Sequence, residues 1–293
     1  MKKSLGAIAA LILTGGLLAG CASGDTNPTT TTTTPSEPVT IRVVTSVSNS
    51  FPFIAVQAME KLGTFEGTNL KIEVIEGTTP TIGQILAGNQ ADIALAGAGT
   101  VVAVRSQGLE VSLVGSDLSY WDQRIIVGAD SGINTVEQLK GKNFGISGAG
   151  SPGHYSVLKL AQKMGWVEGT DYTLTTLGNL GALTAALTAG SIDMFAWSSQ
   201  AAFQMEGRGD GKILALGSDY VGPNVLQAFG VMDTFMAKHP EAVKEFFEAY
   251  YAMVKKLQAD PKLFTDVLVN DWEVAQPVAD RVAKESLPDL SSD

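Results

Sequence analysis

Residues 143–154 read Asn-Phe-Gly-Ile-Ser-Gly-Ala-Gly-Ser-Pro-Gly-His, and this stretch decides the fold class. Its first five residues form a short β-rich run, and the glycines and serines of 148–153 form a turn. An amphipathic helical pattern follows from His154 to Met164, with apolar residues on one face. A strand, a small polar turn and a helix in that order predict a βα unit of a parallel sheet.

The same order of strand and helix recurs on both sides of this stretch. We predict two consecutive α/β units of about 90 residues each, followed by a helical tail with prolines near its helix starts. The predicted strands are 41–45, 71–75, 91–96, 111–115, 123–128, 143–147, 172–176, 192–197, 212–216 and 227–233. The predicted helices are 53–62, 81–87, 101–106, 135–139, 154–164, 180–189, 234–238, 240–258, 261–270 and 277–285.

Three turns that follow predicted strands are small and rich in hydroxyl groups: 46–50, 97–100 and 147–154. In a parallel sheet, ligands gather outside the carboxyl ends of the strands, where helix N-termini present free N–H groups. Glycine lets a ligand approach the backbone, and the helix dipole favours an anionic group. Ser, Thr and Gly are also common helix caps, so it is the recurrence at three strand ends that favours binding.

Aromatic residues and one histidine extend this predicted site. Tyr120 lies between the two units, and Trp197 ends a strand next to two serines, so it can wall a pocket. His154, at a helix start where a cation is disfavoured, is a candidate neutral donor or a capping residue. The residues that we expect to bind a ligand are Ser46, Asn49, Ser50, Phe51, Gly97, Gly99, Thr100, Tyr120, Ser147, Gly150, Ser151, His154 and Trp197, with Asn49, Thr100 and Ser151 as leading hydrogen-bonding candidates.

Other chemistries find little support in the sequence. Residues 148–153 fit Gly-x-Gly-x-x-Gly, but Pro152 within the motif and the exported context argue against a dinucleotide site. The two histidines have no cysteine or acidic cluster at metal spacing and no nucleophile partner, so we expect no metal, no cofactor and no enzymatic activity. A net charge of −10 without basic clusters disfavours nucleic acid and an anionic bilayer surface as partners of the folded part.

The N-terminal segment indicates export and lipid anchoring. Lys2 and Lys3 precede an apolar run that is too short to span a membrane, which is typical of a cleaved signal peptide over 1–20. Cys21 is the single cysteine and follows Leu-Ala-Gly, so that Leu-Ala-Gly-Cys resembles a bacterial lipobox in which the cysteine is lipidated. Residues 21–38, rich in Thr and Pro, predict a disordered tether. We therefore expect a protein on the extracytoplasmic face of a cell membrane, held there by its lipid alone.

Three segments resemble those of bacterial solute-binding proteins. Residues 88–94 resemble Gly-x-x-Asp-Ile-Ala, and residues 185–193 resemble the Ala-Leu-x-x-Gly-x-Ile-Asp turn of that family. Residues 135–146 resemble its Asp-Leu-Lys-Gly-Lys-x-Ile-Gly segment, with Gln138 where aspartate is common. Over about residues 39–258 the chain is similar to the nitrate/sulfonate/taurine branch of ABC-transporter substrate-binding proteins.

This resemblance implies a type II periplasmic-binding-protein fold, with two α/β lobes joined by a two-stranded hinge. It implies lobe 1 over 39–122, lobe 2 over 123–226, and a return strand and C-terminal helices of lobe 1 over 227–293, with one terminal helix absent or reduced after Pro277. It also implies a monomer that hands its ligand to an ABC permease and ATPase. The pocket turns lack the arginine that carboxylate-binding relatives use, which favours a sulfonate-like or neutral polar ligand over an amino acid.

The function that we expect is therefore capture of a small anionic or polar organic ligand, of sulfonate, taurine or nitrate type, in a cleft between the lobes. A lyase or dehydratase on the same fold is one alternative, and export argues against it. A ligand-sensing receptor partner and a protein that binds a pyrimidine precursor of thiamine are the others.

Overall fold

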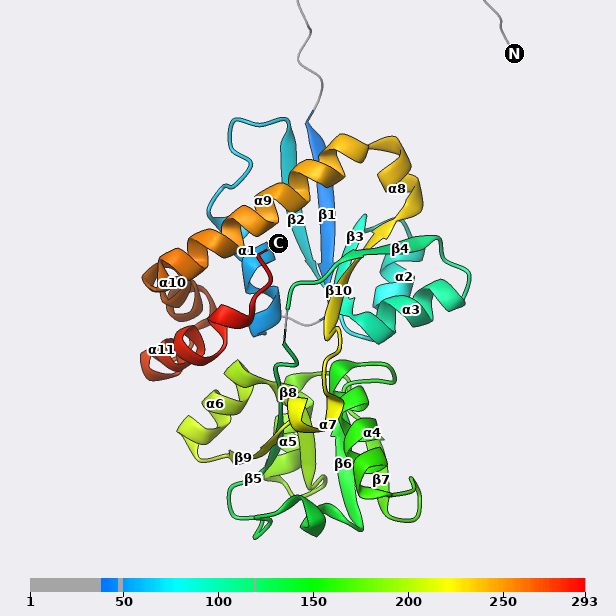
Figure 1. The fold of residues 1–293 in the computed structure, drawn as a ribbon, viewed down its shortest axis with the longest axis vertical. Helices are drawn as coiled ribbons and strands as arrows, with labels where there is room; N and C mark the ends of the chain where they lie inside the picture. Colours follow the sequence, from blue (N-terminus) through cyan, green and yellow to red (C-terminus); the bar gives the residue numbers. More distant parts are fainter. Residues whose placement is uncertain (1–37, 47–49, 119, 293) are drawn as a thin grey trace, which may run out of the picture. The chain divides into compact units, whose positions relative to one another are not determined.

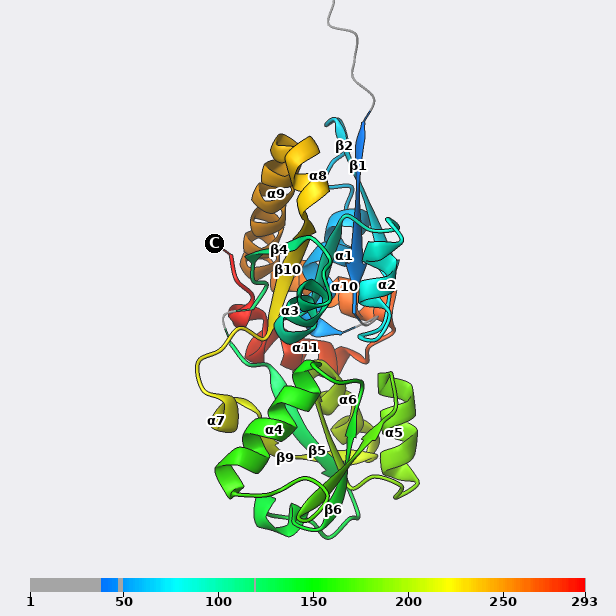
Figure 2. The same ribbon diagram turned by 90° about the vertical axis from the view of Figure 1, so that its right-hand side faces the viewer.

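The structure is a computed structural model that describes residues 38–46, 50–118 and 120–292. The described residues form two five-stranded sheets, each covered by helices on both faces (Figures 1 and 2). We call the first sheet with its helices lobe 1, and the second sheet with its helices lobe 2. Asn49, Cys21, the signal segment 1–20 and nearly all of the tether 21–38 lie outside the described residues.

The two sheets have the same topology. The first has the order β2-β1-β3-β10-β4 and the second the order β7-β6-β8-β5-β9. In lobe 1, β1 is parallel to β2 and β3, whereas β10 pairs antiparallel with β3 and β4. In lobe 2, β6 is parallel to β7 and β8, whereas β5 pairs antiparallel with β8 and β9. Each sheet thus contains one antiparallel strand that enters from a segment crossing between the lobes, 116–122 before β5 and 217–226 before β10.

The bounds of the elements follow the alternation in the sequence. The strands are β1 Val39–Thr45, β2 Leu70–Glu76, β3 Ile93–Gly97, β4 Val111–Gly115, β5 Gln123–Gly128, β6 Lys142–Ile146, β7 Tyr172–Thr176, β8 Met194–Ser198, β9 Gly211–Leu216 and β10 Gln227–Met232. The helices are α1 Ile54–Lys61, α2 Ile82–Ala87, α3 Ala98–Ser106, α4 Pro152–Met164, α5 Leu180–Thr188, α6 Ser199–Arg208, α7 Ser218–Val221, α8 Asp233–Lys238, α9 Pro240–Ala259, α10 Pro261–Trp272 and α11 Gln276–Glu285.

Most of the predicted elements are confirmed, and the differences are local. The strand predicted over 143–147 is β6, which ends at Ile146 so that Ser147 belongs to the turn, and α4 begins at Pro152. The short helix expected over 135–139 is a 3₁₀ turn, Val136–Leu139, closed by a capping box between Thr135 and Gln138. The sequence reading missed α6 and α7.

Lobe 1 has the larger core. On one face of its sheet, Val44 and Ala94 pack against α2 and α3, with Val104 of α3 in the same layer. The other face packs through Ile41, Ile93 and Phe229 against a layer that contains α1, α9, α10 and α11. Figure 1 shows α9 and α10, in orange, beside the first sheet on the side away from α2 and α3. The apolar stripe of α9, spaced at three and four residues, explains why that helix lies on the sheet.

Lobe 2 is a smaller sandwich of the same kind. Phe144 and Met194 of its sheet pack against Val157 and Leu160 of α4. The opposite face packs through Phe195 against α5 and α6. Each face of both sheets therefore has its own hydrophobic layer, as parallel sheets require.

A matching pair of hydrogen bonds shows how similarly the two sheets are built. Asp92, just before β3, accepts from the backbone N–H of Arg42 in β1 at 2.9 Å. Asp193, just before β8, accepts from the backbone N–H of Asn143 in β6 at 2.8 Å. Both bonds join positions 50 residues apart. These aspartates belong to two of the three segments that carry the family resemblance, 88–94 and 185–193.

Besides the crossing segments, helix α11 of lobe 1 joins the lobes by contacting α6 of lobe 2. The Arg281 guanidinium lies 3.7 Å from the ring centroid of Phe203 and forms an ion pair with Glu206 at 2.9 Å. The hydroxyls of Ser286 and Ser199 are 2.6 Å apart in the same region. The C-terminal helices therefore contact lobe 2 as well as completing lobe 1.

Candidate functional site

Four helix N-termini face the region between the two sheets. In lobe 1, the 3₁₀ turn Phe51–Phe53 leads into α1 after β1, and α3 begins directly after β3. In lobe 2, α4 follows β6 and α6 follows β8. The positive ends of helix dipoles thus come from both lobes, although the first N–H of α6 already donates to the carboxylate of Asp122. This arrangement favours an electronegative ligand group without any charged side chain.

The cavity between these helix starts, which we call the interlobe cavity, has a volume of about 30 Å³. It is lined by residues of both lobes and both crossing segments: Ser46, Ser50, Thr79, Gln123, Ser147, Pro152, Gly153, Trp197 and Gln227. The lining offers hydroxyl, amide and indole groups, and none of these residues carries a charge. A cavity of this size has room for about two water molecules, so the lobes are closed on each other.

Direct contacts between the lobes hold this closed arrangement. The Ser50 and Ser198 hydroxyls are 3.0 Å apart, and both residues are buried. The Thr100 hydroxyl donates to the backbone carbonyl of Gly150 at 3.4 Å. A Cβ atom at Gly97 would lie 2.7 Å from Cδ of Pro152, so a side chain there would push the lobes apart.

The structure brings together part of the predicted ligand-binding set. Ser46, Ser50, Ser147 and Trp197 line the interlobe cavity. Five further predicted residues lie at or beside the contact between the lobes, where they meet the opposite lobe or cap α4: Gly97, Gly99, Thr100, Gly150 and Ser151.

Three predicted residues lie elsewhere. Phe51 is fully buried in the core of lobe 1, where its ring packs edge-on against Phe264 at 6.1 Å, because the residue after Ser50 turns toward α10. The Tyr120 hydroxyl is hydrogen-bonded to Ser218, joining the two crossing segments. Neither side chain lines the cavity.

His154 supports the turn before α4 instead of lining the cavity. Its Nδ1 accepts from the backbone N–H of Gly150 at 3.0 Å, and its own N–H donates to the capping hydroxyl of Ser151 at 3.2 Å. Burial lowers the pKa of His154 below its usual value, which favours the neutral ring that can accept at Nδ1. His154 thus has a structural role in this turn, which the sequence did not show.

Sequence reasoning missed several lining residues. Gln123 and Gln227 open the strands β5 and β10, whose antiparallel entry into the sheets depends on pairings that are distant in sequence. Thr79 follows β2, and the turn Gly77-Thr78-Thr79-Pro80 is a further polar turn after a parallel strand that could have been recognised. The buried Ser198 was noted only as a neighbour of Trp197 and was not predicted as a site residue, because α6 was not predicted.

Buried acids lie in the first crossing segment, near the cavity but outside its lining. Burial raises the pKa of Asp122 to about 6, against the effect of Arg124, whose Nη1 is 3.6 Å from the carboxylate. Asp122 also accepts from the N–H and hydroxyl of Ser199 at 3.0 and 3.1 Å. Burial likewise raises the pKa of Asp117 well above its usual value, and neither of its carboxyl oxygens has a hydrogen-bond partner. Arg124 thus faces Asp122 and is not part of the cavity lining.

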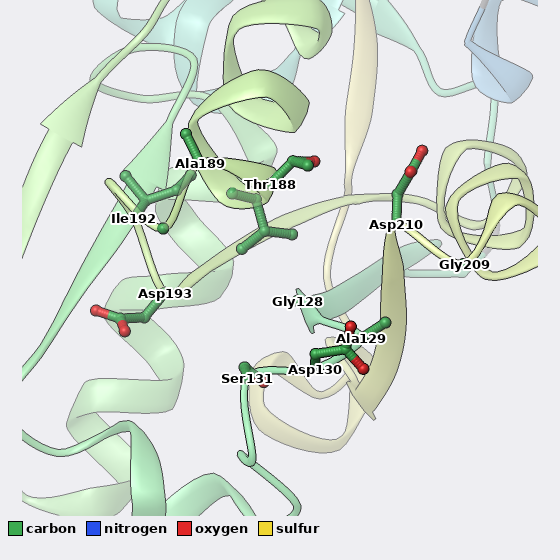
Figure 3. Close-up of a pocket in the computed structure, with 12 residues that line it drawn as sticks. Gly128, Ala129, Asp130, Ser131, Thr188, Ala189, Ile192, Asp193, Gly209 and Asp210 are labelled. Carbon is green, nitrogen blue, oxygen red and sulfur yellow. The ribbon is translucent and has the colours of Figure 1, made fainter.

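A larger hollow of about 420 Å³ lies in lobe 2 around the ends of β5 and α5 (Figure 3). Three acids line it, Asp130, Asp193 and Asp210. Asp193 and Asp210 are partnered by Asn143 and by Arg208, respectively, and Figure 3 shows the carboxylates of these two pointing in different directions. None of the predicted site residues lines it. We place the site at the smaller interlobe cavity because the helix N-termini of both lobes meet there.

In 38–46, 50–118 and 120–292, no three or more His, Cys, Asp or Glu side chains are grouped so that they could hold a metal ion. Over the same ranges, no helix combines the length and the apolar character needed to cross a membrane.

Two sheets with this strand order and a cavity between them define the type II periplasmic-binding-protein fold, as expected from the sequence resemblance. Residues 50–263 match the family model described as NMT1/THI5 like. The chain belongs to the NMT1/THI5-like family. No curated protein sequence matches the chain.

Solved structures with the same fold include two alkanesulfonate-binding proteins SsuA. The protein from Xanthomonas axonopodis pv. citri, bound to MOPS, has a TM-score of 0.75 and 20% identity over 85% of this chain and 84% of that chain. The periplasmic aliphatic sulphonate binding protein from Escherichia coli has a TM-score of 0.70 and 18% identity over 87% and 86% of the respective chains. The Candida albicans CA3427 gene product, described as having the generic periplasmic binding protein fold, has a TM-score of 0.71 and 15% identity over 86% and 81%.

Proposed function

We propose that this protein captures a small oxyanionic or polar organic ligand outside the cytoplasm and delivers it to an ABC importer. The observation that carries the proposal is an uncharged cavity between the lobes that is lined by hydroxyl groups and reached by one helix start from each lobe, at Ser50 before α1 and at Pro152 and Gly153 of α4. A sulfonate suits this environment because it is an acceptor at three oxygens and needs several donors but no counterion. The two SsuA proteins of the same fold bind alkanesulfonates and aliphatic sulphonates, respectively, and support the same chemistry.

Capture proceeds by opening and closing of the lobes about the two crossing segments. A cavity of about 30 Å³ is too small for a sulfonate, so the contact between Ser50 and Ser198 must break for the ligand to enter. A ligand that contacts both lobes then favours a closed form. The lining groups of the cavity bind by hydrogen bonds and do not titrate near neutral pH, which supports binding over acid–base catalysis.

The importer and the membrane are the partners in this proposal. One structural neighbour, from Staphylococcus aureus, is described as the ligand binding component of an ABC-type import system. The lipid on Cys21 would hold the protein near its permease, and a Cys21→Ala variant should move from the membrane fraction to the soluble fraction on cell fractionation. A variant that stays with the membrane would contradict anchoring through Cys21.

The binding site is tested by titration calorimetry of the protein with isethionate, which is 2-hydroxyethanesulfonate. Ser46 and Ser147 hold equivalent positions after β1 and β6, and both line the cavity. The double variant Ser46→Ala/Ser147→Ala should bind isethionate roughly tenfold to a hundredfold more weakly, because two hydrogen bonds to an anion are lost.

Thr188→Ala is the matched control. It removes a hydroxyl from the lining of the other hollow and should leave isethionate affinity unchanged. Isethionate binding that is lost in Thr188→Ala and retained in the serine double variant would place the site in the other hollow and refute the assignment.

A further inference from the structure

Two glutamines line the interlobe cavity. Each is the first residue of a strand that follows a crossing segment. Gln123 is the first residue of β5 and Gln227 the first residue of β10, and both line the cavity. Gln123 is 5% exposed and Gln227 is 4% exposed. Long polar side chains are rarely so deeply buried unless their polar atoms have partners.

The backbone fixes the position of both glutamines. The carbonyl of Gln123 accepts from the N–H of Gly217 at 2.7 Å, and the carbonyl of Gln227 accepts from the hydroxyl of Ser116 at 2.9 Å. Gly217 lies in the crossing segment 217–226, and Ser116 lies in the crossing segment 116–122. Each glutamine is therefore bonded to the crossing segment that precedes the other glutamine. The glutamines are therefore held where the two crossing segments meet the cavity.

The side chain of Gln227 has an unmet hydrogen-bonding requirement. Its Oε1 is buried and has no hydrogen-bond partner. A buried amide oxygen without a donor is costly, and the cost is removed by any ligand that brings a donor. The other polar groups of the cavity differ in kind, because the hydroxyls can donate or accept and the helix N-termini only donate.

We propose that Gln227 is a specificity-determining residue, which selects ligands that carry an N–H or O–H donor beside the oxyanionic group. This inference rests on the proposed function and names the ligand class more closely. The oxyanion takes the donors that the hydroxyls and helix N-termini supply, and the second group of the ligand donates to Oε1 of Gln227. An anion that is only an acceptor leaves this oxygen unpaired and binds more weakly.

The test compares isethionate with ethanesulfonate, which has the same sulfonate and two-carbon chain but lacks the hydroxyl. In calorimetry the wild-type protein should bind isethionate about 5- to 100-fold more tightly than ethanesulfonate, the range expected for satisfying one buried acceptor. Gln227→Met keeps the length of the side chain and removes its polar atoms. It should bring the ratio of the two affinities close to one, chiefly by weakening isethionate.

Two further variants complete the design. Gln107→Met, on the exposed end of α3, is the control and should keep the wild-type ratio. Gln227→Glu keeps an acceptor and adds a negative charge, so it should favour taurine, whose donor is an ammonium group, over isethionate. This variant tests the assignment even if the methionine variant does not fold.

The outcomes separate the inference from the proposed function. Wild-type affinities that are equal for the two sulfonates, or a ratio unchanged in Gln227→Met, overturn the role of Gln227 and leave sulfonate capture intact. Absence of binding by either sulfonate overturns both.

Discussion

Lobe 1 and lobe 2 share one strand order and differ in what covers it. In both lobes, an aspartate directly before one strand accepts a hydrogen bond from a backbone N–H of the neighbouring parallel strand. Asp92 before β3 accepts from β1, and Asp193 before β8 accepts from β6. Lobe 1 adds α9, α10 and α11 on one face, whereas lobe 2 has only the helices that connect its own strands. The candidate site uses what the lobes share, namely strand ends and helix starts. The helices that lobe 2 lacks give lobe 1 the larger hydrophobic core.

The largest expected effect comes from the aromatic cores. Phe229 of lobe 1 packs against Phe246, Phe247 and Tyr250 at 6.0, 5.1 and 4.9 Å between ring centroids. Phe229→Ala should lower the free energy of unfolding by roughly 3–5 kcal/mol, as expected for a buried ring. Urea denaturation followed by circular dichroism measures this loss.

Phe144→Ala is the matched change in lobe 2. Phe144 is equally buried but packs against two rings, Tyr172 at 5.0 Å and Trp166 at 6.4 Å. Because one aromatic pair contributes about 1 kcal/mol, its loss should be about that much smaller. A larger loss at Phe144 would show that lobe 2, despite its thinner cover, has the more demanding core.

An intermediate effect is expected from the two equivalent aspartates. The carboxylate of Asp92 accepts from the backbone N–H, Nε and Nη2 of Arg42, at 2.9, 2.9 and 2.7 Å, whereas Asp193 accepts from the backbone N–H of Asn143 and faces Lys142 at 3.7 Å. The Asp92 side chain is 7% exposed and that of Asp193 32%. Asp92→Asn should therefore cost about 2 kcal/mol of unfolding free energy and Asp193→Asn about 1 kcal/mol. Equal losses of unfolding free energy in chemical denaturation would show that the guanidinium hydrogen bonds of Arg42 add nothing to the backbone hydrogen bond that both aspartates accept.

The sequence predicted the fold well because its information was local. The strand, turn and helix order of 143–154 depends on neighbours a few positions away, and the two aspartates belong to short motifs, 88–94 and 185–193, that are recognisable in the sequence. The helix α6 was missed because its first turn, Ser199 to Ala202, is buried throughout, between the lobe 2 sheet and the C-terminal segment of lobe 1, and lacks an amphipathic contrast. Burial on all sides hides the helical period from the sequence.

The candidate site was less predictable because it forms where distant segments meet. Ser46 and Ser147 follow parallel strands, so a general rule for such sheets was enough to find them. Gln123 and Gln227 reach the cavity only through the antiparallel pairings of β5 and β10 with strands of other units. Phe51 follows a site residue in sequence, but packing against Phe264 directs its ring into the core. Tertiary packing decides whether each of these side chains reaches the cavity, and the spacing of residues along the chain does not show this packing.

The smallest expected effect tests whether the lobes unfold together. Arg281 of α11 and Glu206 of α6 form the ion pair between lobes, with side chains 40% and 31% exposed, so screening limits its contribution to about 0.2–1 kcal/mol. A double-mutant cycle with Arg281→Met and Glu206→Gln measures the coupling free energy in urea denaturation.

The Lys262 and Asp266 pair within α10 provides a matched cycle in one lobe, with about 0.3–0.5 kcal/mol expected. If the C-terminal helices join the lobes into one cooperative unit, both cycles give comparable coupling. Coupling that persists for the α10 pair and vanishes for Arg281 and Glu206 would mean that lobe 2 unfolds before lobe 1, and the lobes would then be independent in stability although they share a site.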